Sequence, residues 1–177
     1  MKSFKTYKSH FILSVLGISL LIFPPVYGGT TEEHEIIHKS SVAPFNEPQF
    51  TKAGELTFFS KNNRKITTID IEIPDTLEEK RRGLMYRHVM ADSEGMVFVN
   101  DMSRYHFFWM KNTYIPLDMI FVDEKMQIVK IEKNTIPLSE KIIAVPKDAQ
   151  YTIEVNAGFC DRHRIKSGDS IQMVKKL

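Results

Sequence analysis

Apolar and polar residues alternate along much of the chain, in a pattern that predicts short β-strands. Between residues 69 and 73, for example, isoleucine alternates with Asp70 and Glu72, which is typical of a strand with one face in the core. Similar apolar segments, separated by turn residues, recur to the end of the chain. We expect strands at Leu56–Phe59, Ile66–Ile73, Met96–Val99, His106–Met110, Leu117–Val122, Gln127–Glu132, Tyr151–Val155 and Ser170–Val174.

One segment has the period of an amphipathic helix instead. Asp75 precedes Glu78 by three residues in a capping-box arrangement, so we expect a helix over residues 76–89. Arg81 falls on the apolar stripe of this helix and is therefore expected on its buried side. One or two further helical turns are expected over residues 160–165.

Together these elements predict an α+β domain at residues 54–177. Its architecture should be a compact, mostly antiparallel, β-barrel-like sheet with one main helix and short helical turns. Residues 29–53 show neither helical nor strand period and contain Pro44 and Pro48. We expect them to form a flexible leader, without which the domain should still fold.

The first 28 residues have the features of a signal peptide. Three lysines precede Phe11–Phe23, an apolar run of 13 residues, and two prolines follow it. We expect cleavage between Gly28 and Gly29 and an extracytoplasmic, periplasmic location. The alternative is an uncleaved anchor, but a membrane span needs about 20 apolar residues. We therefore expect no stable membrane span after cleavage.

Composition excludes several classes of protein. The 177 residues are 42% hydrophobic and carry 24 basic and 22 acidic side chains, a net charge of +2. Basic and acidic residues are interspersed, whereas nucleic-acid binders gather their basic residues into a patch. We therefore expect no nucleic-acid partner. The chain has one cysteine, Cys160, so it cannot be a disulfide scaffold, and we expect this thiol in the core.

Asp118 is the first candidate functional residue. Strand alternation places it on the same face as apolar residues, and a carboxylate in that position must be paired or protonated. Arg81, Lys111 and backbone amides near Pro116 are the candidate partners, and we expect an Arg81–Asp118 pair at the mouth of a cleft. Both a structural buried pair and a functional site stay open.

The segment 107–113 supplies further candidates. It contains Trp109, the only tryptophan of the chain, next to Lys111 and Asn112. An aromatic platform flanked by ammonium and amide donors is suited to a polar small molecule or a sugar-like ring. The candidate cleft therefore consists of Arg81, Trp109, Lys111, Asn112 and Asp118.

Several motifs follow one another along the chain: Arg81–Arg87, Gly95–Phe98, Phe108–Thr113, Ile115–Asp123, Glu154–Gly158 and Ile165–Asp169. In this order, over about residues 56–174, they resemble the bacterial and archaeal family called domain of unknown function 192, or uncharacterised protein family 0127. The resemblance implies an exported bacterial protein with a compact, β-rich, barrel-like domain. It implies no activity, cofactor or catalytic residue.

Three functions are therefore compatible with the sequence. The first is a non-catalytic binding module for a small polar ligand, an envelope glycan or an envelope protein, and it needs no cofactor. The second is a hydrolase or transferase that uses Asp118 as general acid or base. The third is metal binding by His88, His106 and His163, but these lack a metal-ligand spacing, so we expect no metal.

Overall fold

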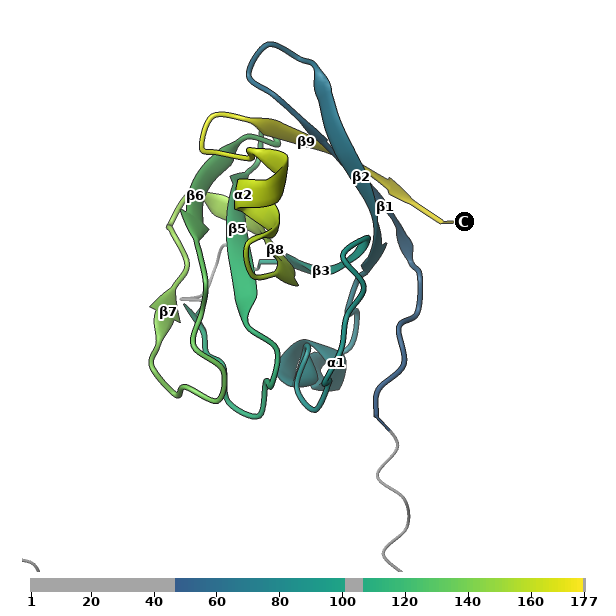
Figure 1. Cartoon of the computed structure of the whole chain (residues 1–177), viewed down its shortest axis with the longest axis vertical. Helices are drawn as coiled ribbons and strands as arrows, with labels where there is room; N and C mark the ends of the chain where they lie inside the picture. Colours follow the sequence, from purple (N-terminus) through teal and green to yellow (C-terminus); the bar gives the residue numbers. More distant parts are fainter. Residues whose placement is uncertain (1–46, 101–106, 177) are drawn as a thin grey trace, which may run out of the picture. The chain divides into compact units, whose positions relative to one another are not determined.

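The structure, a computed structural model, describes residues 47–100 and 107–176, so the predicted signal peptide lies outside the described residues. The described chain forms nine strands and two short helices (Figure 1). In chain order these are β1 (Gly54–Phe59), β2 (Lys65–Glu72), α1 (Leu77–Arg82), β3 (Glu94–Val99), β4 (Phe107–Phe108), β5 (Leu117–Asp123), β6 (Ile128–Glu132), β7 (Ile143–Ala144), β8 (Ala149–Asn156), α2 (Phe159–His163) and β9 (Ser170–Lys175).

Seven of the strands form one mixed sheet in the order β6-β5-β8-β3-β2-β1-β9, and β4 pairs with β7 in a second, two-stranded sheet. The β2–β3 pair is parallel, and the other strand pairs are antiparallel. One isolated bridge, Gln127 to Ser170, joins the residue before the edge strand β6 to the first residue of the edge strand β9. The predicted α+β domain with a mostly antiparallel sheet is confirmed, but the described strands form no closed barrel.

Each predicted strand is found, with bounds shifted by a few residues. The largest change is in the segment predicted as His106–Met110, whose first residue lies outside the described part. Of residues 107–110 only Phe107 and Phe108 form a strand, β4, and the Met110 N–H donates to the Ser139 carbonyl outside any ladder. The short strand β7, which pairs with β4, was not predicted. Two residues are too few to show a period in the sequence.

The main helix is much shorter than predicted. Helix α1 has Thr76 as its N-cap and ends at Gly83, whose φ of 49° lies in the left-handed region that favours glycine. A Cβ on Gly83 would also lie 3.2 Å from the Phe98 ring. None of the α1 residues is buried, so the expectation that Arg81 lies on a buried stripe is wrong.

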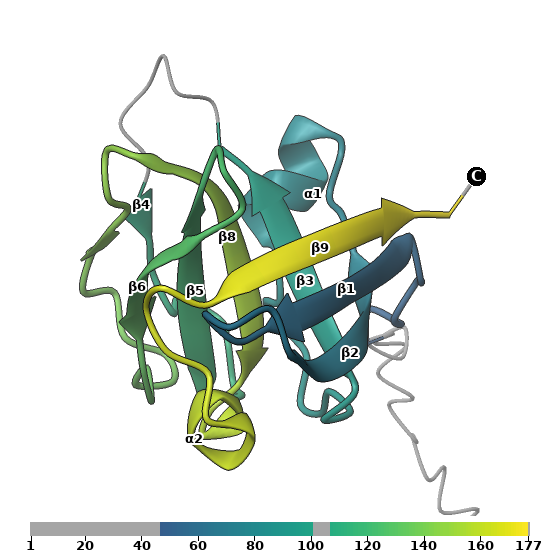
Figure 2. The ribbon, with the colours of Figure 1, turned by 90° about the horizontal axis from the view of Figure 1, so that it is seen from above.

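The two faces of the large sheet carry separate cores, and strand β8 contributes to both. Ile153 and Val155 of β8 belong to a cluster that also contains Phe159 of α2. The other cluster contains Met96 of β3, Met119 of β5 and residues from the segment after α1. Helices α1 and α2 consequently lie at opposite ends of the domain (Figure 2).

Residues 47–53, the last part of the predicted leader, pack on the domain. The Thr51 N–H donates to Glu72 Oε1 over 2.7 Å, and the Ala53 N–H donates to the Ile71 carbonyl over 2.8 Å. The prediction of a flexible leader is therefore wrong for these residues, because backbone hydrogen bonds leave no apolar period in the sequence. Residues 29–46 lie outside the described part.

A search of the described helices for a membrane span gives a negative result: none is long and apolar enough to cross a bilayer.

Candidate functional site

A cavity of about 730 Å³ lies where the end of α1 faces the segment 107–113. Among the described residues, the end of β3 and one residue of β8 also line it. Four of the five candidate residues line this cavity: Arg81, Trp109, Lys111 and Asn112. The fifth, Asp118, does not.

Two hydrogen bonds hold the facing walls of the cavity together. The Tyr86 N–H donates to the Asn112 carbonyl over 2.8 Å, and the Asn112 side-chain amide donates to the Tyr86 hydroxyl over 2.9 Å. Asn112 has a φ of 54°, a left-handed conformation that asparagine tolerates better than most residues. Asn112 thus positions the segment that carries Trp109 and Lys111.

Trp109 presents an accessible aromatic surface in the cavity lining. Its side chain is 38% exposed, and the Lys111 ammonium nitrogen lies 5.1 Å from the ring centroid. The Phe107 ring meets the indole edge to face, with 6.4 Å between centroids. This is the aromatic platform with a neighbouring cation that the sequence predicted, and Lys111 also lies 3.4 Å from the Glu140 carboxylate.

Glu154 is a buried acid of the lining that the sequence analysis missed, as it missed the exposed Lys80 and Arg82. It lies in β8, directly opposite Met96 of β3 on one side and Met119 of β5 on the other, and it is 4% exposed. Burial raises the pKa of its carboxyl group to about 8, so the protonated form prevails at neutral pH. The alternation argument applied to Asp118 would not have found Glu154, because the residues on its own face of the strand, Thr152 and Asn156, are polar.

The polar neighbours of Glu154 on the same face of β8, Thr152 and Asn156, each have a side-chain hydrogen bond within the protein. The Thr152 hydroxyl accepts a hydrogen bond from the Asn100 amide over 3.2 Å, and the Asn156 amide donates to the Met90 carbonyl over 2.7 Å. Within residues 47–100 and 107–176, no hydrogen bond or ion pair to the Glu154 side chain is found. Glu154 is therefore the polar group of this strand that is left to interact with the cavity.

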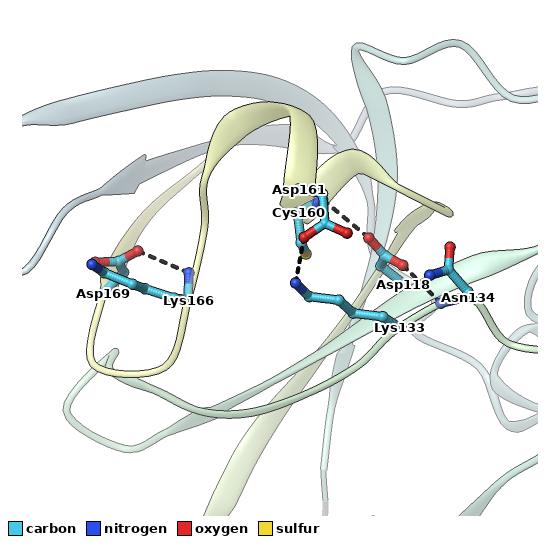
Figure 3. A network of polar contacts seen from close by, with 7 residues as sticks. All are labelled: Asp118, Lys133, Asn134, Cys160, Asp161, Lys166 and Asp169. Carbon is cyan, nitrogen blue, oxygen red and sulfur yellow. Dashed lines mark hydrogen bonds and ion pairs between the residues drawn. The ribbon is translucent and has the colours of Figure 1, made fainter.

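Asp118 lies on the opposite face of the sheet and has a structural role. Its side chain is 0% exposed, and its two oxygens accept the backbone N–H groups of Asn134 and Cys160 over 2.9 and 3.0 Å (Figure 3). The carboxylate thus connects β5 to the start of α2 and to the segment after β6. The predicted Arg81–Asp118 pair is wrong, because Arg81 is exposed and Asp118 accepts the backbone amides of Asn134 and Cys160. These amides are not the ones near Pro116 that the sequence analysis named.

A buried ion pair does exist, but between other residues. Arg87 Nη2 lies 2.6 Å from Glu72 Oε2, and the two side chains are 6% and 11% exposed. Sequence reasoning could not find this pair, since Arg87 was expected in a helix that ends five residues before it.

Cys160 lies in the core, as expected. Burial and the neighbouring Asp118 carboxylate raise the pKa of its thiol above its usual range, which makes it a poor nucleophile.

Two of the three histidines considered as metal ligands contact other aromatic rings: His88 stacks on Tyr114, and His163 tilts over Phe159. His106 lies outside the described residues.

Comparisons with known proteins agree on the fold. The family model DUF192, described as "Uncharacterized ACR", matches residues 58–173. A candidate transcription regulator from Sinorhizobium meliloti 1021 is 31% identical, with a TM-score of 0.64 over 71% of this chain and 98% of that chain. A protein of unknown function from Novosphingobium aromaticivorans DSM 12444 is 32% identical, with a TM-score of 0.61 over 67% of this chain and 83% of that chain. A search of curated proteins finds no match.

Proposed function

The chain belongs to the DUF192 family, and from the geometry of its cavity we propose that the domain is a binding module for a small polar ligand. The observation that carries the proposal is the gathering of Arg81, Trp109, Lys111 and Asn112 around one cavity. Its volume of about 730 Å³ falls within the usual range for small-molecule sites, about 300–1,000 Å³. This size favours a small molecule, or one residue of an envelope glycan, over a protein partner.

The chemistry of the lining supports the same proposal. An exposed indole face binds the apolar face of a ring, while the Lys111 ammonium and the Asn112 amide supply hydrogen-bond donors next to it. A hydrolase or transferase that uses Asp118 gains no support, because both oxygens of that carboxylate are engaged away from the cavity.

Trp109 fluorescence tests the proposal directly, because the chain contains no other tryptophan. The purified protein is titrated with glucose, N-acetylglucosamine, N-acetylmuramate, glucuronate and glucose 6-phosphate. We expect at least one compound to change the emission saturably, with weaker binding in Arg81→Gln and Lys111→Gln. The proposal would be overturned if none of the five compounds bound saturably at millimolar concentration.

We also propose that the protein is exported and loses residues 1–28. The support is the lysine-rich start of the chain and an apolar run too short for a membrane span. Intact-mass measurement of the protein from its native host tests this, and a mass that retains Met1–Gly28 would contradict it.

A further inference from the structure

The described cavity lining carries an excess of positive charge. Lys80, Arg81 and Arg82 come from the last turn of α1, and Lys111 comes from the opposite wall. Basic residues at the end of a helix interact favourably with its dipole, which accounts for the first three but not for Lys111. Among the described lining residues the only acid is Glu154. Lys111 also lies 3.4 Å from the Glu140 carboxylate, so the positive charge that attracts anions comes mainly from the end of α1.

The basic side chains of this lining and its one carboxyl group differ in burial. Arg81 is exposed, whereas Glu154 is almost fully buried between two methionines. A bound molecule that contacts both residues therefore places one end near solvent among basic side chains and the other end against a buried carboxyl group.

Glu154 faces the cavity and not a sealed core: among the described residues, the buried side-chain atoms without a hydrogen-bond partner are Glu72 Oε2 and Arg87 Nε, and neither oxygen of Glu154 is one of them. On either side of Glu154 along the same face, Thr152 and Asn156 each have a partner within the protein. The chain thus satisfies the neighbouring polar residues and leaves Glu154, in the lining of the cavity, to a partner from outside the described fold.

We infer that the ligand is an acidic, sugar-like molecule whose anionic group lies among Arg81 and Lys111 and whose uncharged hydroxyl or amide group hydrogen-bonds to Glu154. This inference rests on the proposed binding function and specifies its ligand class. Glu154 acts as a specificity residue: when protonated it both donates and accepts a hydrogen bond, and it adds no negative charge beside an anionic ligand.

The protonation state of Glu154 then controls affinity. Ionised Glu154 can only accept hydrogen bonds, and it repels the anionic ligand. The charged groups that share the described cavity lining are Lys80, Arg81, Arg82 and Lys111, while β3 and β5 place uncharged methionines beside Glu154. Affinity should therefore fall as the pH rises through about 8, the pKa of the buried carboxyl.

The test compares glucuronate with glucose, and N-acetylmuramate with N-acetylglucosamine, by Trp109 fluorescence between pH 6 and pH 9. We expect each acidic compound to bind at least about tenfold more tightly than its neutral counterpart at pH 6.5, the scale of one charge-assisted hydrogen bond. Glu154→Gln should retain binding at pH 6.5 and lose the decline in affinity above pH 8, because an amide both donates and accepts but does not titrate.

Glu154→Met, which extends the flanking methionines, should weaken binding about tenfold or more. Glu124→Gln, on an exposed turn, is the matched control and should behave as the unmodified protein. Circular dichroism verifies that each variant is folded. Equal affinity for acidic and neutral compounds, or unchanged binding by Glu154→Met, would overturn this inference and leave the binding function intact. Failure of glucuronate, N-acetylmuramate and glucose 6-phosphate to bind, while glucose or N-acetylglucosamine binds, would overturn the inference alone; failure of all five compounds to bind would overturn the binding function as well.

Discussion

Arg87 and Glu72 form a buried ion pair with 2.6 Å between Nη2 and Oε2, and this pair connects the segment after α1 to the end of β2. Glu72 also accepts the Thr51 N–H, so the same carboxylate fixes the residues that precede β1. Loss of one charge would leave the other buried without a partner, which costs more than the pair itself contributes.

We therefore expect Arg87→Met or Glu72→Gln alone to lower the free energy of unfolding by about 3–5 kcal/mol. The double variant Arg87→Met/Glu72→Gln should recover part of that loss, because no unpaired charge remains. The exposed Lys52–Glu55 pair is the control, and Glu55→Gln should leave the free energy of unfolding nearly unchanged, because solvent screens an exposed pair. Denaturant unfolding measures these values, and additive single losses at Arg87 and Glu72 would contradict the pairing.

Removal of residues 47–53 should weaken the domain without unfolding it. A chain that begins at residue 54 loses the hydrogen bond from Thr51 to Glu72 and exposes the buried pair. Compared with a chain that begins at residue 47, we expect a loss of about 1–3 kcal/mol in denaturant unfolding. Equal stability of the two chains would show that this segment contributes nothing.

Asp118 should matter for stability and not for binding. In Asp118→Asn, an amide group that donates hydrogen bonds replaces one oxygen that now accepts the N–H of Asn134 or Cys160. We expect a loss of about 1–3 kcal/mol in thermal or denaturant unfolding, with Asp148→Asn as an exposed control. Ligand affinity should be unchanged, and a variant that loses binding while keeping full stability would place Asp118 in the site.

Glu154 should make the stability of the protein depend on pH. Its pKa is raised from 4.5 to about 8 by burial, so between these values the folded state holds a proton that the unfolded state has released. Stability should consequently fall as the pH rises from about 5 to about 8, by up to about 1.4 kcal/mol for each pH unit. Glu154→Gln should remove this decline and Glu124→Gln should not; a parallel decline in both variants would assign it to other groups.

The sequence predicts the strands well because each one has an apolar core face that repeats every second residue. It fails at α1 because the capping signal marks where a helix begins, whereas the end depends on the left-handed conformation of Gly83 and its contact with Phe98. The stripe that placed Arg81 in the core assumed that the helix continued. Arg87 and Glu72 are paired by tertiary structure, which no local period reveals.

The sequence predicts best the part of the candidate site that lies within one short segment. Trp109, Lys111 and Asn112 are close in sequence, so one short segment brings them together. Alternation places Asp118 on an apolar face and Glu154 on a face with the polar Thr152 and Asn156, and it cannot tell which face of the sheet carries a cavity. The register of β8 between β3 and β5 separates them: Asp118 contacts the backbone near α2, and Glu154 lines the cavity.

The most direct test of the binding site is amide chemical-shift mapping by NMR during titration with glucuronate. The account predicts that the perturbed amides cluster at residues 80–86, 98–100, 107–113 and 153–155, which surround the cavity. Amides near Asp118 and in α2, on the other face of the sheet, should stay unchanged. Perturbations centred on Asp118 and α2, or no perturbation at millimolar glucuronate, would contradict the assignment of this cavity as a site for acidic sugars.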